Sequence, residues 1–286
     1  MKNPAKTTSN HHALARLCSS LPGDFTHLSA LSPDQGTNAD RVVRQWRPGS
    51  AGALHSEIFA CGNEAAGAGM ALSLALDAMR AAARDKSGPA AAAPSDDQRA
   101  ILWVQERAAA KRGGYPYRLG MPPDLQRRVI HVLAEKPKDA LFALEEGVRC
   151  RDLAFVVGEI VGNPQVLDFT ASRRLSLAAE HHGVPLWLVR IDASRDLSSA
   201  RMRWDARSAP SPRPRWNRDA PGTPGWHANL FRARTHPPAE WIMRDDGYRL
   251  DIEPPERQHT GAGAGQRSGS GSGPANPVDL VRAAGD

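Results

Sequence analysis

Two glycines, Gly62 and Gly67, lie between a strand-like apolar run and a longer helix-like apolar run. Their spacing is that of a P-loop, G-x-x-x-x-G-K-[ST], in which backbone N–H groups surround a phosphate at the start of a helix. A P-loop also needs a lysine for the outer phosphates and a hydroxyl for Mg²⁺. Ala68 and Gly69 stand at those two positions here. The segment therefore predicts the backbone scaffold of a phosphate site without its charged chemistry.

The candidate loop residues share one short turn between the two apolar runs. They are Gly62, Asn63, Glu64, Gly67, Ala68 and Gly69. Glu64 adds a negative charge inside the loop, and the nearest lysine downstream is Lys86, beyond the helix-like run. Tight binding of a nucleoside triphosphate is therefore not expected, and we predict no catalytic residue, cofactor or metal ion.

Strand and helix patterns alternate around this loop, which predicts βαβ units and a mostly parallel sheet covered by helices on both faces. The expected strands are 55–60, 101–104, 127–134, 152–160 and 184–191, and the expected helices are 67–83, 138–150 and 168–183. The fold class is therefore α/β.

Beyond the last of these strands the pattern changes to alternating side chains separated by proline-rich links. Three strands are expected, at 200–208, 225–234 and 240–250, which either extend the same sheet by antiparallel pairing or form a small appended sheet. The predicted organisation is an N-terminal segment (1–40) with a short helix at 12–20, an α/β core (41–192), a β extension (193–253) and a disordered Gly/Ser/Pro-rich tail (254–286).

The composition of the 286 residues is that of an ordinary globular protein with a basic balance, because the net charge is +6 and the pI about 9.6. Three widely spaced cysteines fit neither a disulfide framework nor a zinc site. No leader-like apolar region follows the N-terminal lysines, and no run approaches the length of a membrane helix. A cytoplasmic protein is therefore expected, with no membrane partner.

The loop and two of the apolar runs carry a resemblance to RecA-type recombinases. "GNEAAGAG" is similar to their Walker A loop in length and in its third residue, glutamate. "ILWVQERAA" resembles the next strand, and it places Glu106 where those enzymes activate water. "LAFVVGEI" resembles the Walker B strand and puts Gly158 or Glu159 at the metal-associated position. Since the lysine and hydroxyl are missing, Glu106 is expected to be a relic, and Glu159 either to hold a metal or, preferentially, to pair with an arginine.

A more specific resemblance is to the ImuA family of bacterial SOS-response proteins. "GALHSEIFA", "ALEEGVRCRDLAFVVGEIVGNPQVLDFTASRRLSLAAEHHGVPLWLVR" and "ARMRWDARSAPS" carry it, and it covers about residues 40–250. It implies a RecA-like core and a role accessory to translesion synthesis after DNA damage. The implied partners are an ImuB-like Y-family polymerase homologue and an error-prone replicative-type DNA polymerase subunit. A RecA filament, single-stranded DNA and self-association are further candidates.

Two other functions stay open from the sequence. One is a DNA-dependent ATPase of RecA type with a diverged P-loop. Glu106 favours this function, whereas Ala68, which stands in place of the lysine, argues against it. The other is an SOS-induced inhibitor of cell division, because regulators of that kind also resemble stripped RecA folds.

Arginine and tryptophan gather in the C-terminal region, a combination that can track phosphates and stack on bases. Residues 195–257 hold twelve arginines, four tryptophans and nine acidic residues. The candidate DNA contacts are Arg203 and Arg207 in this region, together with Arg173 and Arg174 on the expected helix at 168–183.

Overall fold

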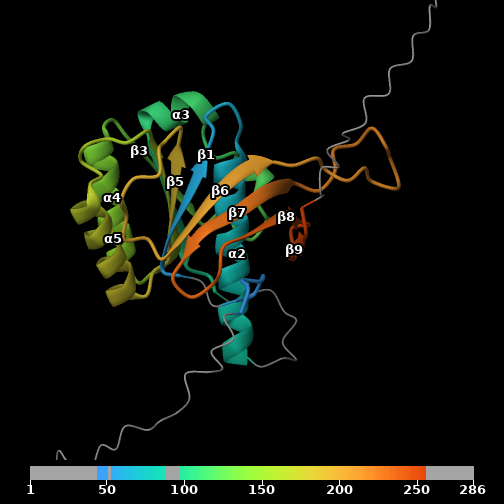
Figure 1. The fold of residues 1–286 in the computed structure, drawn as a ribbon, viewed down its shortest axis with the longest axis horizontal. Coiled ribbons are helices and arrows are strands. Elements are labelled where there is room, and N and C mark those ends of the chain that lie inside the picture. Colours follow the sequence, from blue (N-terminus) through green and yellow to red (C-terminus); the bar gives the residue numbers. More distant parts are fainter. Residues whose placement is uncertain (1–43, 51–52, 88–96, 256–286) are drawn as a thin grey trace, which may run out of the picture. The chain divides into compact units, whose positions relative to one another are not determined.

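A nine-stranded sheet runs through the described part of the chain, in the order β3-β2-β4-β5-β1-β6-β7-β8-β9 (Figure 1). The structure is a computed structural model, and it describes residues 44–50, 53–87 and 97–255. Strands β3, β2, β4, β5, β1 and β6 are parallel to one another, whereas β7 pairs antiparallel with β6, and β8 and β9 continue the antiparallel pairing. The chain is therefore an α/β protein with a mixed, mostly parallel sheet.

The strands and helices follow one another along the chain with short connections. The strands are β1 (His55–Ala60), β2 (Ala100–Glu106), β3 (Val129–Ala134), β4 (Leu153–Val161), β5 (Leu186–Ile191), β6 (Met202–Ser208), β7 (Gly225–Ala233), β8 (Ala239–Asp245) and β9 (Leu250–Glu253). The helices are α2 (Ala66–Ser87), α3 (Arg107–Gly113), a 3₁₀ turn η2 (Arg118–Gly120), α4 (Pro137–Arg149) and α5 (Phe169–His182).

Local sequence signals explain why these elements form where they do. β4 is an almost unbroken apolar run and is buried over nearly its whole length, as a strand covered on both faces must be. In β7 buried side chains alternate with half-buried ones, which is the pattern of a strand with one covered face. The side chain of Asp168 accepts a hydrogen bond from the Ala171 N–H at the start of α5, and Gly183 ends that helix with φ 70°.

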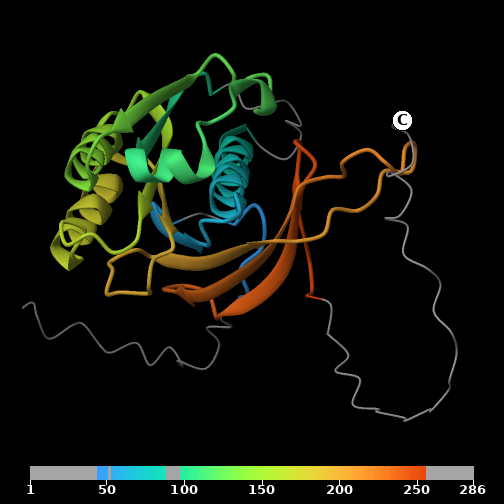
Figure 2. The same cartoon turned by 90° about the horizontal axis from the view of Figure 1, so that it is seen from above.

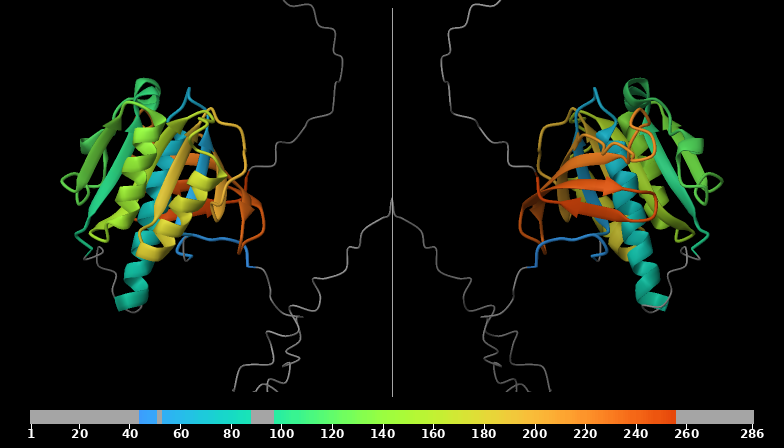
Figure 3. Two further views of the ribbon diagram at one scale, coloured as in Figure 1. Left: turned by 90° about the vertical axis from the view of Figure 1, so that its left-hand side faces the viewer. Right: turned by 90° about the vertical axis from the view of Figure 1, so that its right-hand side faces the viewer.

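Helices cover the two faces of the sheet and create two apolar cores. α4 and α5 pack together on one face, where Leu144 and Leu175 are completely or almost completely buried against β4 and β5 (Figure 3). α2 covers the other face, with Met70 and Leu74 in its core. Figure 2 shows that the sheet curves around α2, so that β2 and β3 lie on one side of this helix and β6 to β9 on the other. The glycine loop begins this central helix.

The structure differs from the sequence prediction at three places. The segment after β2 turns directly into the helix α3, which was not predicted. The last predicted strand, 240–250, is two strands, β8 and β9, joined by a tight turn at Gly247. β6 joins the sheet by parallel pairing with β1 and not by antiparallel pairing. The helix expected at 12–20, the rest of 1–40 and the tail beyond residue 255 lie outside the described residues.

None of the described helices combines the length and the apolar character needed to cross a membrane.

Candidate functional site

The glycine loop lies where the parallel strands end, at the edge of the sheet where ligands of α/β proteins usually bind. It links β1 to α2, and Gly67 fixes how closely α2 approaches the sheet. A Cβ at this position would lie 2.7 Å from Ala60 Cβ and 2.7 Å from Val189 Cγ1. Only glycine therefore allows the first turn of α2 to pack directly on β1 and β5.

An internal carboxylate occupies the mouth of the loop. Asp192 directly follows β5, and its Oδ1 accepts a hydrogen bond of 2.7 Å from the Gly62 N–H. Arg112 of α3 forms an ion pair with the other oxygen of the same carboxylate. Asp192 has φ 50°, and its own N–H donates to the Ala60 carbonyl at 2.9 Å. The first amide of the loop is therefore bound by a carboxylate that the protein itself supplies.

Glu64 ties the loop to the neighbouring strand β6. Its Oε2 accepts a hydrogen bond of 2.7 Å from the Ser208 N–H, at the last residue of β6. Hydrogen bonds from the side chain and the backbone of Ser208 lower the pKa of Glu64, and the nearby Arg207 guanidinium acts in the same direction. Glu64 therefore attaches the loop to the end of β6, while Asn63 beside it is exposed.

The two positions that would carry P-loop chemistry are half-buried, and both line a cavity beside the loop. Ala68 is half-buried and packs against the core on the α2 side of the sheet. A Cβ at Gly69 would lie 3.0 Å from Cζ2 of Trp226, a buried residue of β7. A threonine at Gly69 would thus meet an indole ring, because the C-terminal strands have closed over this turn of α2.

The two glutamates on the strand ends are both engaged within the protein. Glu106 is 7% exposed, and its Oε2 accepts a hydrogen bond of 3.1 Å from the Val161 N–H at the end of β4. Glu159 is 4% exposed, and its Oε1 accepts from Trp103 Nε1 at 2.6 Å and from Gln105 Nε2 at 3.1 Å. Burial raises the pKa of Glu159. The prediction that Glu159 pairs with an arginine is therefore wrong, since its hydrogen-bond partners are Trp103 and Gln105.

A cavity of about 300 Å³ lies beside the loop, between the ends of β2, β4 and β5 and the segment that follows α3. Its walls are mainly apolar, and its polar groups include Glu159, Gln105 and Arg112. Tyr115 and Tyr117, which are 63% and 70% exposed, stand at its outer side. The volume is at the lower limit of small-molecule sites. In the described residues, no group of three His, Cys, Asp or Glu side chains converges as a metal site would require.

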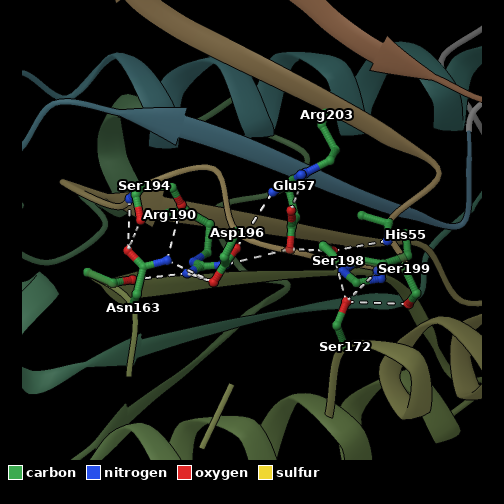
Figure 4. A network of polar contacts seen from close by, with 12 residues as sticks. His55, Glu57, Asn163, Ser172, Arg190, Ser194, Asp196, Ser198, Ser199 and Arg203 are labelled. Carbon is green, nitrogen blue, oxygen red and sulfur yellow. Dashed lines mark hydrogen bonds and ion pairs between the residues drawn. The ribbon is translucent and has the colours of Figure 1, made fainter. Parts of the chain in front are cut away.

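A second polar feature, absent from the sequence prediction, is a buried network of charges between β1, β5 and β6 (Figure 4). Glu57 of β1 is completely buried, and its Oε2 accepts a hydrogen bond of 2.8 Å from Arg203 Nε. Arg190 Nη1 lies 3.7 Å from Glu57 Oε1, and its Nη2 lies 3.3 Å from Asp196. Ser198 donates a further hydrogen bond of 2.8 Å to Glu57.

This network corrects the prediction for Arg203. The residue is 3% exposed and is bound to Glu57 below the surface, so its guanidinium is not available to DNA. A strand position with alternating side chains gives no sign of whether a charged residue faces solvent or a buried partner.

Serines connect the same network to α5 and to a buried histidine. His55 Nδ1 lies 2.7 Å from Ser176 Oγ, and Ser176 Oγ lies 2.6 Å from Ser199 Oγ. Ser172 Oγ lies 3.3 Å from Ser199 Oγ and 2.9 Å from Ser198 Oγ, which completes the connection to Glu57. Complete burial lowers the pKa of His55 to about 3, and the charge of Arg203 adds to that effect. The histidine is therefore neutral at ordinary pH, and it does not line the cavity beside the loop.

The other candidate DNA contacts lie on two different elements. Arg173 and Arg174 are exposed on α5, and Arg174 Nη2 lies 3.3 Å from Glu145 of α4. Arg207 is exposed at the end of β6, close enough to Glu64 to lower its pKa. The described structure does not gather these arginines with Arg203 into one surface.

Comparison with models of known protein families gives no match to this chain, and no curated protein matches it either.

Proposed function

We propose that this protein is a non-catalytic accessory subunit of a DNA-damage-inducible translesion synthesis complex, built on a RecA-like core. Its proposed partners are an ImuB-like Y-family polymerase homologue and an error-prone replicative-type polymerase subunit. The resemblance of three sequence runs to the ImuA family is the basis for the pathway. The sheet and the loop are the basis for the other two parts of the proposal, the RecA-like core and the absence of catalysis.

The placement of the loop supports a RecA-like core. β1 carries the loop and β4 carries Glu159, and β5 lies between these two strands in the sheet. β2, which ends at Glu106, is the other neighbour of β4. The three positions that match the RecA-type motifs thus end at one edge of the sheet, as a phosphate, a metal and a water molecule would require.

The observation that carries the non-catalytic part is the hydrogen bond from the Gly62 N–H to Asp192. Triphosphate hydrolysis needs free loop amides, a lysine, a metal-binding hydroxyl and a base that reaches water. Here Asp192 binds the Gly62 amide, and Ala68 and Gly69 replace the lysine and the hydroxyl. Glu106 is buried on the Val161 amide. Each of these groups serves the packing of the fold, so we infer that the protein acts through its surfaces.

Co-purification tests this proposal. A tagged copy of the chain, expressed after DNA damage, is expected to retain a polymerase-like protein. The purified protein is expected to hydrolyse ATP at the background rate, with and without single-stranded DNA. ATP turnover that Glu106→Gln abolishes would show a diverged ATPase instead. Recovery of cell-division proteins without any polymerase-like partner would favour a division inhibitor.

A further inference from the structure

The connection between β6 and β7 forms a projecting arm, residues 209–224, which we call the basic arm. It extends away from the sheet in both views that show it from the side (Figures 1 and 2). Its two halves meet at the base, where the Ala209 N–H donates a hydrogen bond of 3.0 Å to the Gly225 carbonyl. Arg244 Nη1 of β8 also donates to the Pro210 carbonyl at 2.9 Å. The arm is thus a defined extension of the sheet.

Five prolines stiffen the arm. The prolines fix φ and remove backbone donors, so the free arm has few conformations to lose when it binds. They are Pro210, Pro212, Pro214, Pro221 and Pro224. Gly222 lies so close to the Pro212 carbonyl that a Cβ there would overlap it, which keeps the two halves together. At the tip the Ala220 N–H donates to the Asn217 carbonyl at 3.3 Å and closes a turn.

Trp216, next to this turn, is the one tryptophan of the chain that is exposed. Its exposed fraction is 82%, whereas each of the other six tryptophans is 7% exposed or less. The buried ones make the aromatic core, as Trp46, Trp204 and Trp241 do through edge contacts. An indole at the end of a stiff arm has no such partner, and stacking on another flat ring would bury it.

Three arginines flank Trp216 in the sequence and have no acidic partner in the described chain. Arg213, Arg215 and Arg218 are exposed, and none of them forms an ion pair within the described chain. Some arginines elsewhere are paired, as Arg195 is with Asp205 and Arg201 with Glu180, whereas others, such as Arg173 and Arg232, are exposed and unpaired in the described chain. Asp219 is the single acidic residue of the arm. A positive tip with an exposed aromatic ring complements a chain of phosphates and bases.

We infer that the basic arm binds single-stranded nucleic acid without sequence preference, with Trp216 stacked on a base and the three arginines on phosphates. The inference deepens the proposed function and rests on it for the biological substrate, single-stranded DNA near a replication block. A protein partner fits this surface less well, because the fully buried centre of a protein interface is mainly apolar. Here a single indole stands among guanidinium groups.

Binding to a fluorescently labelled oligodeoxythymidine of about 20 nucleotides tests the inference on the purified full chain. Trp216→Ala is expected to weaken binding about 10-fold, because loss of one stacked base corresponds to a factor of this order. Trp216→Phe keeps an aromatic face and is expected to keep most of the affinity. Phe142→Ala is the matched control, since Phe142 is 69% exposed on α4, which is not part of the arm.

Salt dependence tests the arginines separately. Replacing Arg213, Arg215 and Arg218 by glutamine is expected to reduce the slope of log affinity against log salt by about 2, since each single-strand phosphate that an arginine neutralises adds roughly 0.7 to that slope. Tryptophan fluorescence gives a direct readout, because oligonucleotide should quench the wild-type emission and leave that of Trp216→Phe unchanged. Circular dichroism confirms that each variant is folded.

Three outcomes would overturn the inference. The first is the absence of oligonucleotide binding by the wild-type chain at low salt, and the second is equal binding by the wild type and the arm variants. The third is an arm variant that loses a polymerase-like protein in co-purification but binds oligonucleotide normally, which would make the arm a protein contact. Because the oligonucleotide assay uses the chain alone, its result is independent of whether the proposed partner is found.

Discussion

The carboxylate of Asp192 accepts a hydrogen bond of 2.7 Å from the Gly62 N–H, although the two residues are 130 positions apart. The carboxylate binds the first amide of the loop, four residues before α2 begins at Ala66. It also pairs with Arg112, so the loop mouth holds a positive group and an internal anion side by side. Whether the loop binds an anion can therefore be tested by changing Asp192.

Removing the carboxylate should therefore open an anion site. Asp192→Gly tolerates the positive φ of this position and leaves the Gly62 amide and Arg112 without their partner. We expect millimolar pyrophosphate to raise the melting temperature of this variant by about 2–4 °C, as an occupied weak site adds about 1 kcal/mol. Asp192→Asn, which retains an acceptor for Gly62, is the control. Equal stabilisation of the wild type by pyrophosphate would contradict the prediction.

Restoring the missing P-loop residues should cost stability and give no enzyme. A Cβ at Gly69 already lies 3.0 Å from Trp226, and the branched side chain of Gly69→Thr would crowd the indole further. We expect Gly69→Thr to lose about 1–3 kcal/mol of unfolding free energy, with Gly69→Ala and Ala68→Lys each losing less. Urea unfolding measures these losses. The double variant Ala68→Lys with Gly69→Thr should hydrolyse no ATP, because Asp192 still binds the Gly62 amide; measurable turnover would refute this account of the loop.

The order of secondary structure could be predicted from the sequence, but the partners of its charged residues could not. The apolar run of β4 and the turn between β1 and α2 follow from local pattern. α3, "RAAAKRG", has no apolar stripe and begins directly where a strand ends, so no local sequence pattern predicts this helix. Asp192 meets Gly62 only because β5 lies beside β1, which is a property of the sheet order.

The same reason explains the errors at Arg203 and Glu159. Arg203 alternates with apolar neighbours in β6, and this pattern assigned it to the surface, whereas Glu57 of β1 draws it inside. Glu159 was expected beside an arginine, but β2 supplies Trp103 and Gln105. Trp216 is exposed because it lies on the arm, whereas the other tryptophans lie in the sheet or in the chain that packs against it. The proline-rich sequence around Trp216 suggests such an arm, but the residue type alone does not predict exposure.

The buried histidine predicts how stability changes with pH. His55 has a pKa of about 3 in the folded protein and an ordinary value near 6.5 in the unfolded chain. Between these values the unfolded chain binds a proton that the folded protein does not, so stability falls as pH decreases from about 6.5 towards 3. From pH 7 to pH 5 this group alone should remove about 2 kcal/mol.

The variant His55→Gln isolates this contribution from that of other titrating groups. Urea unfolding of the wild type and of His55→Gln at both pH values gives two differences in free energy. The difference for the wild type should be larger by about 2 kcal/mol, because only its unfolded chain gains the proton. An identical pH dependence in both proteins would mean that His55 is protonated inside the fold.

The pair of Glu57 and Arg203 predicts a strong coupling between two strands. Glu57→Met would leave the Arg203 guanidinium buried without its hydrogen-bonded partner, at a cost of about 3–5 kcal/mol. The double variant Glu57→Met with Arg203→Met removes both charges and leaves Arg190 with Asp196, 3.3 Å away. It should therefore be more stable than Glu57→Met alone, because two well-packed apolar groups can replace a buried ion pair at little cost. A double-mutant cycle by urea unfolding measures this coupling. Additive losses from the two single variants would show instead that the pair contributes only through its packing.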